Sequence, residues 1–271
     1  MIELDFGGNP NLNHIFECGQ CFRWNMQTDG SYIGVANGEV VNTSVDGSKI
    51  ILTGARNVEF WTNYFDCSFD YESVKSDFAK DNVLARCIDY GCGIRILRQD
   101  LFETIISFII SANNNIPRIK GIIERLCMLC GERISGEYHT FPTAKQIVKV
   151  GLDKLGTIGA GYRDRYIYKT AKMWLDLNTN FDDLLTAGAR KELLKFPGVG
   201  PKVADCILLF GLRRFDTFPT DVWVKRLMNE AYDVDECDIA VFAEQNFGEY
   251  RGLAQQYLFY YFRDNYEKPN K

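Results

Sequence analysis

The stretch from residue 193 to residue 227 constrains the fold most, because one helix must stop and another must start within it. A helix that ends near Phe196 cannot continue into Pro197-Gly198, since proline and glycine both disfavour a helix interior. Pro201 suits the first turn of a new helix, where its missing N–H costs nothing. We therefore predict a helix, a tight hairpin and a second helix over about residues 189–212.

The predicted hairpin is suited to hold a phosphate. Gly198 and Gly200 let backbone N–H groups approach a ligand closely, and the second helix starts there with the positive end of its dipole exposed. Such a site binds a nucleic-acid backbone rather than a base. We predict that Gly198, Val199 and Gly200 contact DNA phosphates.

Two ionisable residues stand at helix starts in this stretch. Lys202 lies in the first turn of the second helix and Cys206 follows four residues later, so both side chains project from one face. Asp221 follows Pro219-Thr220 and precedes an apolar run, which is the position of a helix N-cap. A lysine and an aspartate are thereby each held at a helix start.

The chain as a whole has the composition of an ordinary globular protein. Its 271 residues are 46% hydrophobic and 25% charged, which suits one large domain or two modest ones. No apolar run reaches the length of a membrane span, and the start at Met1 shows no secretion signal. Nine cysteines, an odd number, favour free thiols in a reducing cytoplasm.

Two Cys-x-x-Cys pairs, Cys18/Cys21 and Cys127/Cys130, raise the hypothesis of a zinc site. The pairs lie far apart in the sequence, and the second has helical spacing, so we favour a structure without zinc. An iron–sulfur cluster would need four closely spaced cysteines near the C-terminus, where only Cys237 lies. We expect neither a metal nor another cofactor.

The net charge of −5 argues mildly against a nucleic-acid partner, because phosphate neutralisation drives such binding. The distribution of charge matters more. Residues 188–214 carry six basic and two acidic side chains, whereas residues 59–81 and 233–249 each carry six acidic ones. The acid is segregated from the hairpin, which permits a local basic face.

The first fifty or so residues favour antiparallel strands. Three turn dipeptides, Asp29-Gly30, Asn37-Gly38 and Asp46-Gly47, separate short runs rich in Tyr, Ile and Val, which predicts a β-meander. Before them Phe22 and Trp24 alternate, which indicates a further strand whose glycine marks a bulge.

From Val58 onward the pattern is helical. Asp100 and Glu103 form a predicted capping box before a helix over residues 101–110 that is apolar nearly all round and therefore buried. The asparagines 113–115 predict a loop, and Ile116 to Cys130 has the spacing of an amphipathic helix. Near the C-terminus, Gln255 and Phe259 are four residues apart and share a predicted helix face.

Five motifs in order along the chain resemble those of the 8-oxoguanine DNA glycosylases, a family of the helix-hairpin-helix, Gly/Pro-rich loop and Asp superfamily. The hairpin motif is the most specific, because it continues into Lys202-Val203-Ala204-Asp205-Cys206 as in that family. The five motifs are Cys18–Trp24, Asn113–Ile119, Gly161–Tyr166, Leu193–Cys206 with Phe218–Val222, and Ala254–Phe259.

This resemblance implies an α+β fold, in which an N-terminal antiparallel sheet packs on a two-lobed helical body. We place the sheet domain, with its flanking helices, at residues 1–96 and the helix-hairpin-helix glycosylase region at residues 97–271. DNA is expected across the cleft where the hairpin, Lys202 and Asp221 meet.

The resemblance also implies the chemistry of a DNA repair glycosylase and AP lyase that excises flipped 8-oxoguanine, preferably opposite cytosine. Lys202 as a neutral amine would attack the sugar C1′ and form a Schiff base, from which the 3′ phosphate leaves by β-elimination. Asp221 would stay ionised and support the cationic transition state. Because attack needs a free amine, we predict that burial and the nearby helix N-terminus lower the pKa of Lys202.

The same resemblance assigns the base-contacting residues. The Gly19 carbonyl would detect the N7–H of the oxidised base, since guanine would present an unpaired acceptor there. Of the other residues, Gln255 would pair with the Watson–Crick edge, Cys206 and Phe259 would sandwich the base, Asn113 and Tyr162 would fill the gap in the duplex, and Arg118 and Arg163 would bind the opposite cytosine.

One position departs from the resemblance. Family members from eukaryotes carry a histidine two residues after the aspartate, and this chain carries Trp223. A DNA phosphate contact by Trp223 would depend on its indole N–H, with stacking as the other option.

Three other functions stay open on the sequence. A sister glycosylase for alkylated bases would fit the fold but would not need Lys202. An endonuclease III-like enzyme for oxidised pyrimidines would lack the β-meander, and a non-catalytic DNA-binding protein would have no reason for Asp221. We expect a monomeric, cytoplasmic protein of prokaryotic origin whose partner is double-stranded DNA containing 8-oxoguanine, with no membrane involved.

Overall fold

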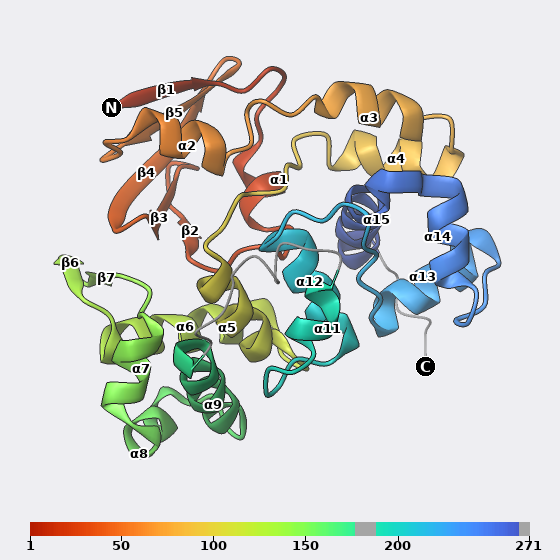
Figure 1. Cartoon of the computed structure of the whole chain (residues 1–271). Coiled ribbons are helices and arrows are strands. Elements are labelled where there is room, and N and C mark those ends of the chain that lie inside the picture. The colour runs from red at the N-terminus through yellow and green to blue at the C-terminus, as the bar shows by residue number, and fades with distance from the viewer. Residues whose placement is uncertain (177–187, 266–271) are drawn as a thin grey trace.

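The computed structural model describes residues 1–176 and 188–265 of the chain. Its N-terminal part is a five-stranded antiparallel sheet with the strand order β1-β5-β4-β3-β2, shown in red and orange in Figure 1. The strands are β1 (Ile2–Asp5), β2 (Trp24–Met26), β3 (Tyr32–Ala36), β4 (Glu39–Asp46) and β5 (Lys49–Thr53).

The three predicted turns make the meander. Asn37 and Gly38 both have positive φ, at 52° and 68°, as a two-residue hairpin of type I′ requires. Strand β1 pairs with β5 at one edge of the sheet, where Ile2 lies opposite Leu52 and Leu4 opposite Ile50. All four of these side chains are buried, so the alternation of the sequence matches the buried face of the sheet.

The segment before β2 differs from the strand that we predicted. Residues 17–23 form a series of bends, and the strand begins only at Trp24. The short helix α1 (Leu12–Phe16), capped by Asn11, lies between β1 and these bends. Gln20 is fully buried in this segment and bonds to backbone outside any strand, which explains the irregular path.

An aromatic cluster fixes the sheet to the first helices. Phe16 stacks on Trp24 with ring centroids 4.3 Å apart, and the Trp24 indole donates to the Tyr64 hydroxyl at 2.9 Å. Three helices follow the sheet, each with an Asn or Asp side chain at its N-cap, as the first turn requires. They are α2 (Val58–Tyr64), α3 (Tyr71–Phe78) and α4 (Asn82–Tyr90).

The rest of the described chain is helical apart from a two-stranded hairpin. One group of helices comprises α5 (Leu101–Ser111), α6 (Ile116–Cys130), α7 (Ala144–Val150), α8 (Leu152–Leu155), η1 (Gly156–Ile158) and α9 (Arg163–Asp176), with β6 (Arg133–Ser135) and β7 (Tyr138–His139) between α6 and α7. The others are α11 (Ala189–Leu193), α12 (Pro201–Phe210), α13 (Val222–Tyr232), α14 (Ile239–Phe247), η2 (Gly248–Tyr250) and α15 (Arg251–Asn265).

Helix α12 lies in the middle of the helical part, with α5, α6 and α9 on one side and α13, α14 and α15 on the other (Figure 1). Helix α4, from the N-terminal part, packs on α15, where Tyr90 contacts Tyr260 at a ring distance of 5.4 Å. The α+β architecture that we predicted is therefore confirmed, while the division of the chain at residue 96 stays a prediction. Within the described residues, no helix is both long and apolar enough to cross a membrane.

The predicted capping box of α5 is only half formed. Asp100 is the N-cap and accepts from the Glu103 N–H at 2.8 Å. The Glu103 carboxylate instead lies 3.9 Å from the Arg23 guanidinium, because the irregular segment before β2 brings that arginine to the start of α5. Burial raises the pKa of Glu103 to about 7, although Arg23 lowers it.

Candidate active site

The hairpin has the predicted form. Helix α11 ends at Leu193, and α12 begins with Pro201 in its first turn. Gly198 has a φ of +86°, and a Cβ there would stand 2.8 Å from the Tyr166 ring, so only glycine fits. Gly200 is the N-cap of α12 and has no side chain to satisfy the first N–H groups, which leaves them available to an anion.

Val199, which we predicted as a phosphate contact, helps to close the turn of the hairpin in the DNA-free protein. Its side chain is buried, and its backbone N–H donates to the Phe196 carbonyl at 3.0 Å. The amide is used to close the turn, so Val199 contributes packing to the hairpin. The phosphate contacts of Gly198, Val199 and Gly200 stay predictions.

Lys202 and Cys206 lie one turn apart on α12 and line the same pocket. The lysine is partly buried, and its ammonium nitrogen lies 6.0 Å from the centre of the Phe108 ring on α5. The Cys206 thiol is buried. Burial raises the pKa of this thiol above its ordinary value, although Lys202 lowers it.

Our prediction of a lowered pKa for Lys202 is wrong for the DNA-free protein. Burial lowers the pKa of this lysine, but Cys206 and Asp221 favour its charged form and together raise the pKa above the ordinary value. The sequence indicated burial and the helix start but not the closeness of these two partners. At neutral pH the Lys202 side chain is therefore mainly in its ammonium form.

Asp221 is the N-cap of α13, as predicted. One of its carboxylate oxygens accepts from the Trp223 and Val224 N–H groups at 2.9 and 3.0 Å. The loop that carries Asp221 is pressed against the first turn of α15, because Gly252 lies so close that a Cβ there would be 2.8 Å from the Thr217 carbonyl. The carboxylate itself is fixed by the first turn of α13.

One pocket brings six predicted residues together. It is lined by Gly19, Lys202, Cys206, Asp221, Gln255 and Phe259, along with Cys18, Phe108, Phe210, Pro219 and Gln256. Its volume is about 40 Å³. The ring of Phe259 lies over Gly19, 3.4 Å from the position of a Cβ there. The pocket must therefore widen before it can receive a purine.

A second, larger pocket lies between the hairpin and the loop after α5. It has a volume of about 350 Å³ and is lined by Tyr162, Arg163, Gly198, Val199 and Gly200, with Ile109, Ala112 and Tyr166. Tyr162 is 59% exposed, and Asn113 is exposed with a positive φ of 50°. These side chains are free to enter a duplex that lies across the hairpin.

The two predicted cytosine-binding arginines differ in their surroundings. Arg118 is exposed in the first turn of α6. Arg163 is buried, and its guanidinium donates to the carbonyls of Ala112 at 3.1 Å and Asn113 at 3.3 Å. In the DNA-free protein Arg163 therefore holds the Asn113 loop, which the sequence did not indicate.

Trp223 lies at the start of α13 and is 46% exposed. The Arg226 guanidinium lies 5.7 Å from the centre of its ring. Trp223 and Phe259 line a common narrow crevice with Val224, Leu227, Phe262 and Arg263. The indole is exposed, and Trp223 lies beside Phe259, which also lines the pocket of Lys202 and Asp221.

Phe108 and Gln256 are among the five residues of the pocket wall that sequence reasoning missed. Phe108 stacks on Phe210 with ring centroids 5.3 Å apart and an interplanar angle of 9°. Gln256 is buried beside Gln255. Phe108 lies in a helix that is apolar nearly all round, so the sequence could not show which of its side chains face the pocket. Gln256 is a polar residue in an apolar helix, a signal that could have found it.

The cysteines do not gather into a cluster. Cys18, Cys21, Cys127 and Cys130 are all buried free thiols, and burial raises the pKa of Cys18 to about 11. Within residues 1–176 and 188–265, no group of three or more His, Cys, Asp or Glu side chains could hold a metal ion.

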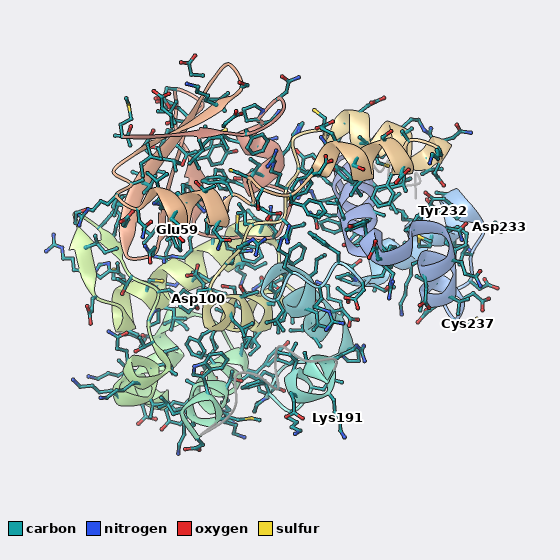
Figure 2. The ribbon with its side chains drawn as sticks, turned by 45° about the horizontal axis from the view of Figure 1, so that its top comes forward. Glu59, Asp100, Lys191, Tyr232, Asp233 and Cys237 are labelled. Atoms are coloured by element: carbon teal, nitrogen blue, oxygen red, sulfur yellow. The ribbon has the colours of Figure 1, made fainter. Side chains whose placement is uncertain are left out.

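The basic residues near the hairpin are largely paired. Residues 188–214 contain six basic side chains, and four of them form ion pairs: Arg190 with Asp205, Lys195 with Glu192, Arg213 with Asp66, and Arg214 with Asp216. Lys191 is exposed and lies at the edge of the helical body, well apart from Glu59 and Asp233 (Figure 2). Asp66 of the acidic segment 59–81 nevertheless reaches Arg213, so the separation of acidic from basic residues that we predicted is incomplete.

Comparison with known proteins assigns the two parts of the chain. Residues 6–105 match the family model described as the N-terminal domain of 8-oxoguanine DNA glycosylase. Residues 106–246 match that of the HhH-GPD superfamily of base excision DNA repair proteins. A probable N-glycosylase/DNA lyase of Methanothermobacter thermautotrophicus is 34% identical over 224 residues, which cover 72% of this chain and 71% of that protein.

Solved structures agree with this assignment. The 8-oxoguanine glycosylase/lyase of Clostridium acetobutylicum, bound to double-stranded DNA with cytosine opposite 8-oxoguanine, is 40% identical with a TM-score of 0.89, over 95% of this chain and 93% of that chain. The 3-methyladenine DNA glycosylase of Archaeoglobus fulgidus shares the fold at 18% identity and a TM-score of 0.80, over 98% of this chain and 99% of that chain. The chain belongs to the 8-oxoguanine DNA glycosylase family within the HhH-GPD superfamily.

Proposed function

We propose that this protein is a DNA glycosylase and AP lyase that excises 8-oxoguanine from duplex DNA, with a preference for cytosine opposite the lesion. The observation that carries the proposal is the single pocket that Lys202, Asp221, Gly19, Gln255 and Phe259 share. A glycosylase for alkylated bases, one of which shares this fold, would not need Lys202.

The pocket separates binding of the base from attack on the sugar. Gly19, Gln255 and Phe259 come from the irregular N-terminal segment and from α15, whereas Lys202 and Asp221 come from the starts of α12 and α13. A flipped nucleotide would place its base on the first set and its sugar on the second. The Gly19 carbonyl would accept from the N7–H of 8-oxoguanine and would face the lone pair of N7 in guanine.

Catalysis begins with the loss of a proton from Lys202, because the ammonium has no lone pair. The neutral amine then bonds to C1′ as the bond from C1′ to the base breaks, and the base leaves with the electron pair and takes up a proton. Asp221, fixed by two backbone N–H groups, stabilises the positive charge that develops on the sugar.

The lyase step follows on the same lysine. The sugar ring opens to give a Schiff base between Lys202 and C1′. Loss of a proton from C2′ then expels the 3′ phosphate and cleaves the strand, and hydrolysis of the imine frees the lysine. Every group in this sequence belongs to one chain, so we propose that the protein acts as a monomer.

The opposite strand would contact the second pocket. Tyr162 and Asn113 would fill the space left by the flipped base, and Arg118 and Arg163 would donate to cytosine. The backbone of Gly198 and Gly200 would hold the phosphates at the start of α12. Arg163 must first leave the carbonyls of Ala112 and Asn113, or else hold the loop while Arg118 makes the base contact.

Borohydride trapping tests the proposal directly. The parent protein is mixed with a duplex that contains 8-oxoguanine opposite cytosine, beside Lys202→Gln. We expect a covalent protein–DNA adduct in the parent and no adduct in the variant. An adduct of equal yield in Lys202→Gln would contradict the role of Lys202, and parent protein that traps only on other damaged bases would contradict the substrate.

A further inference from the structure

The backbone around Gly19 is held by two buried glutamines, one on each side. Gly19 itself has a φ of +85°. Because glycine has no Cβ, it leaves such a conformation easily unless its neighbours restrain it. Its carbonyl can discriminate between two bases only if its direction is fixed, because a hydrogen bond weakens steeply as its angle falls. The restraint on this peptide is therefore part of the specificity of the pocket.

Gln256 supplies the restraint before Gly19. Its side chain is 1% exposed, and its amide nitrogen donates to the Cys18 carbonyl at 2.6 Å. This carbonyl belongs to the peptide bond between Cys18 and Gly19, so the hydrogen bond fixes the plane from which Gly19 continues. Gln256 also follows Gln255 directly on α15, so one helix carries the base-pairing side chain and the anchor.

Gln20 supplies the restraint after Gly19. It is fully buried, and its amide nitrogen donates to the carbonyls of Ile15 at 2.8 Å and Arg95 at 2.7 Å. Its side-chain oxygen accepts from the Leu97 N–H at 2.9 Å. The downstream end of the Gly19 peptide is thereby tied to the segment that precedes α5.

We propose that Gln256 is a positioning residue for lesion discrimination. It holds the Cys18–Gly19 peptide so that the Gly19 carbonyl stays aimed at N7 of the base while Gln255 and Phe259 contact the same base. Without the anchor, the Gly19 carbonyl turns away from the N7 lone pair of guanine, and the penalty against the undamaged base falls. This inference rests on the proposed function, since it concerns how the same pocket selects its substrate.

The test compares Gln256→Met with Thr104→Val. Methionine keeps the length of the side chain and loses the donor. Thr104 is also buried, and its hydroxyl donates to the Asp100 carbonyl at 2.7 Å in α5. Each variant therefore removes one buried hydrogen bond to a backbone carbonyl, and a thermal unfolding curve of each shows whether their losses of stability are similar.

Three duplexes separate positioning from stability: one with 8-oxoguanine opposite cytosine, one with guanine opposite cytosine, and one with an abasic site opposite cytosine. We expect Gln256→Met to reduce the ratio of 8-oxoguanine to guanine binding by about tenfold, and to slow excision of 8-oxoguanine. Its strand cleavage at the abasic site stays at the parent rate, because that substrate has no base for Gly19 to contact. Thr104→Val keeps the parent ratio.

Each other outcome has a distinct meaning. A parent protein that binds both base-containing duplexes equally contradicts the proposed function itself. A parent that discriminates, beside a Gln256→Met variant that keeps the full ratio, overturns the positioning role. A Gln256→Met variant that loses abasic-site cleavage and lesion excision to the same extent also overturns it, because Gln256 would then serve only the stability of the fold.

Discussion

Lys202 and Cys206 lie one helical turn apart on α12 and line the same pocket as Asp221. Cys206 and Asp221 raise the pKa of Lys202 and so favour its ammonium form. Catalysis at neutral pH therefore draws on a small neutral fraction of this lysine, which makes the rate sensitive to pH.

Schiff-base formation should rise with pH. Because the pKa of Lys202 lies above its ordinary value, the neutral fraction grows about tenfold for each pH unit below that pKa. We expect the initial rate of borohydride trapping on abasic-site DNA to follow this slope between about pH 6 and pH 9. A plateau near neutral pH would show that bound DNA has already removed the proton.

Asp221→Asn should separate the two chemical steps. Asparagine is also a good N-cap, so the stability of α13 should change little. Excision of 8-oxoguanine should fall by about 10²- to 10³-fold, because the charge that supports the cationic transition state is lost. Trapping on abasic-site DNA should persist with its pH profile shifted to lower pH, since Asp221 raises the pKa of Lys202.

The two hairpin glycines should respond differently to alanine. Gly198→Ala forces a side chain into a positive φ and against the Tyr166 ring, at a cost of about 1–3 kcal/mol in unfolding free energy, and should weaken DNA binding. A Cβ at Gly200 meets nothing within 4 Å among the residues described, so Gly200→Ala is the matched control for stability. Chemical denaturation of both variants measures the difference.

Arg163 and Arg118 should also differ. Arg163→Ala leaves the Ala112 carbonyl without its donor, which should reduce the unfolding free energy by about 1–3 kcal/mol and loosen the Asn113 loop. Arg118 is exposed, so Arg118→Ala should change stability by less than about 0.5 kcal/mol. Excision rates opposite each of the four bases would show whether either variant loses the preference for cytosine. Equal stability of the two variants would rule out the loop-holding role of Arg163.

Glu103 should make stability depend on pH. Its carboxyl has a pKa of about 7 in the folded protein, against an ordinary value of 4.5, so folding favours its protonated form. That contribution is complete below about pH 4.5 and is lost as the pH rises through about 7. Between about pH 5 and pH 8 the parent should lose about 1–2 kcal/mol more stability than Glu103→Gln. Parallel stability curves would contradict this.

The sequence predicted the parts of the fold that local signals determine. Helix α6 runs from Ile116 to Cys130 as expected, because Asn115 caps it and its apolar residues repeat with helical spacing. The turns at Asn37-Gly38 and Asp46-Gly47 also follow from residues that tolerate positive φ. The N-cap role of Asp221 is equally local, since it depends only on the residues that follow.

What the sequence did not predict depends on contacts between distant segments. The raised pKa of Lys202 comes partly from Asp221, which belongs to another helix. The bends around Gly19 exist because Gln20 and Gln256 bind the backbone of far segments. The contact of Arg163 with the Asn113 loop likewise joins α9 to the end of α5. No local periodicity shows such partners.

The small volume of the lesion pocket has a kinetic consequence. Phe259 lies over Gly19, so the pocket is too small for an extruded base until this ring moves. Each base must displace the Phe259 ring before it can enter the pocket. We expect a base that gains little from the pocket to return to the helix stack sooner than one that the pocket binds well. Selection would then depend on residence time as well as affinity.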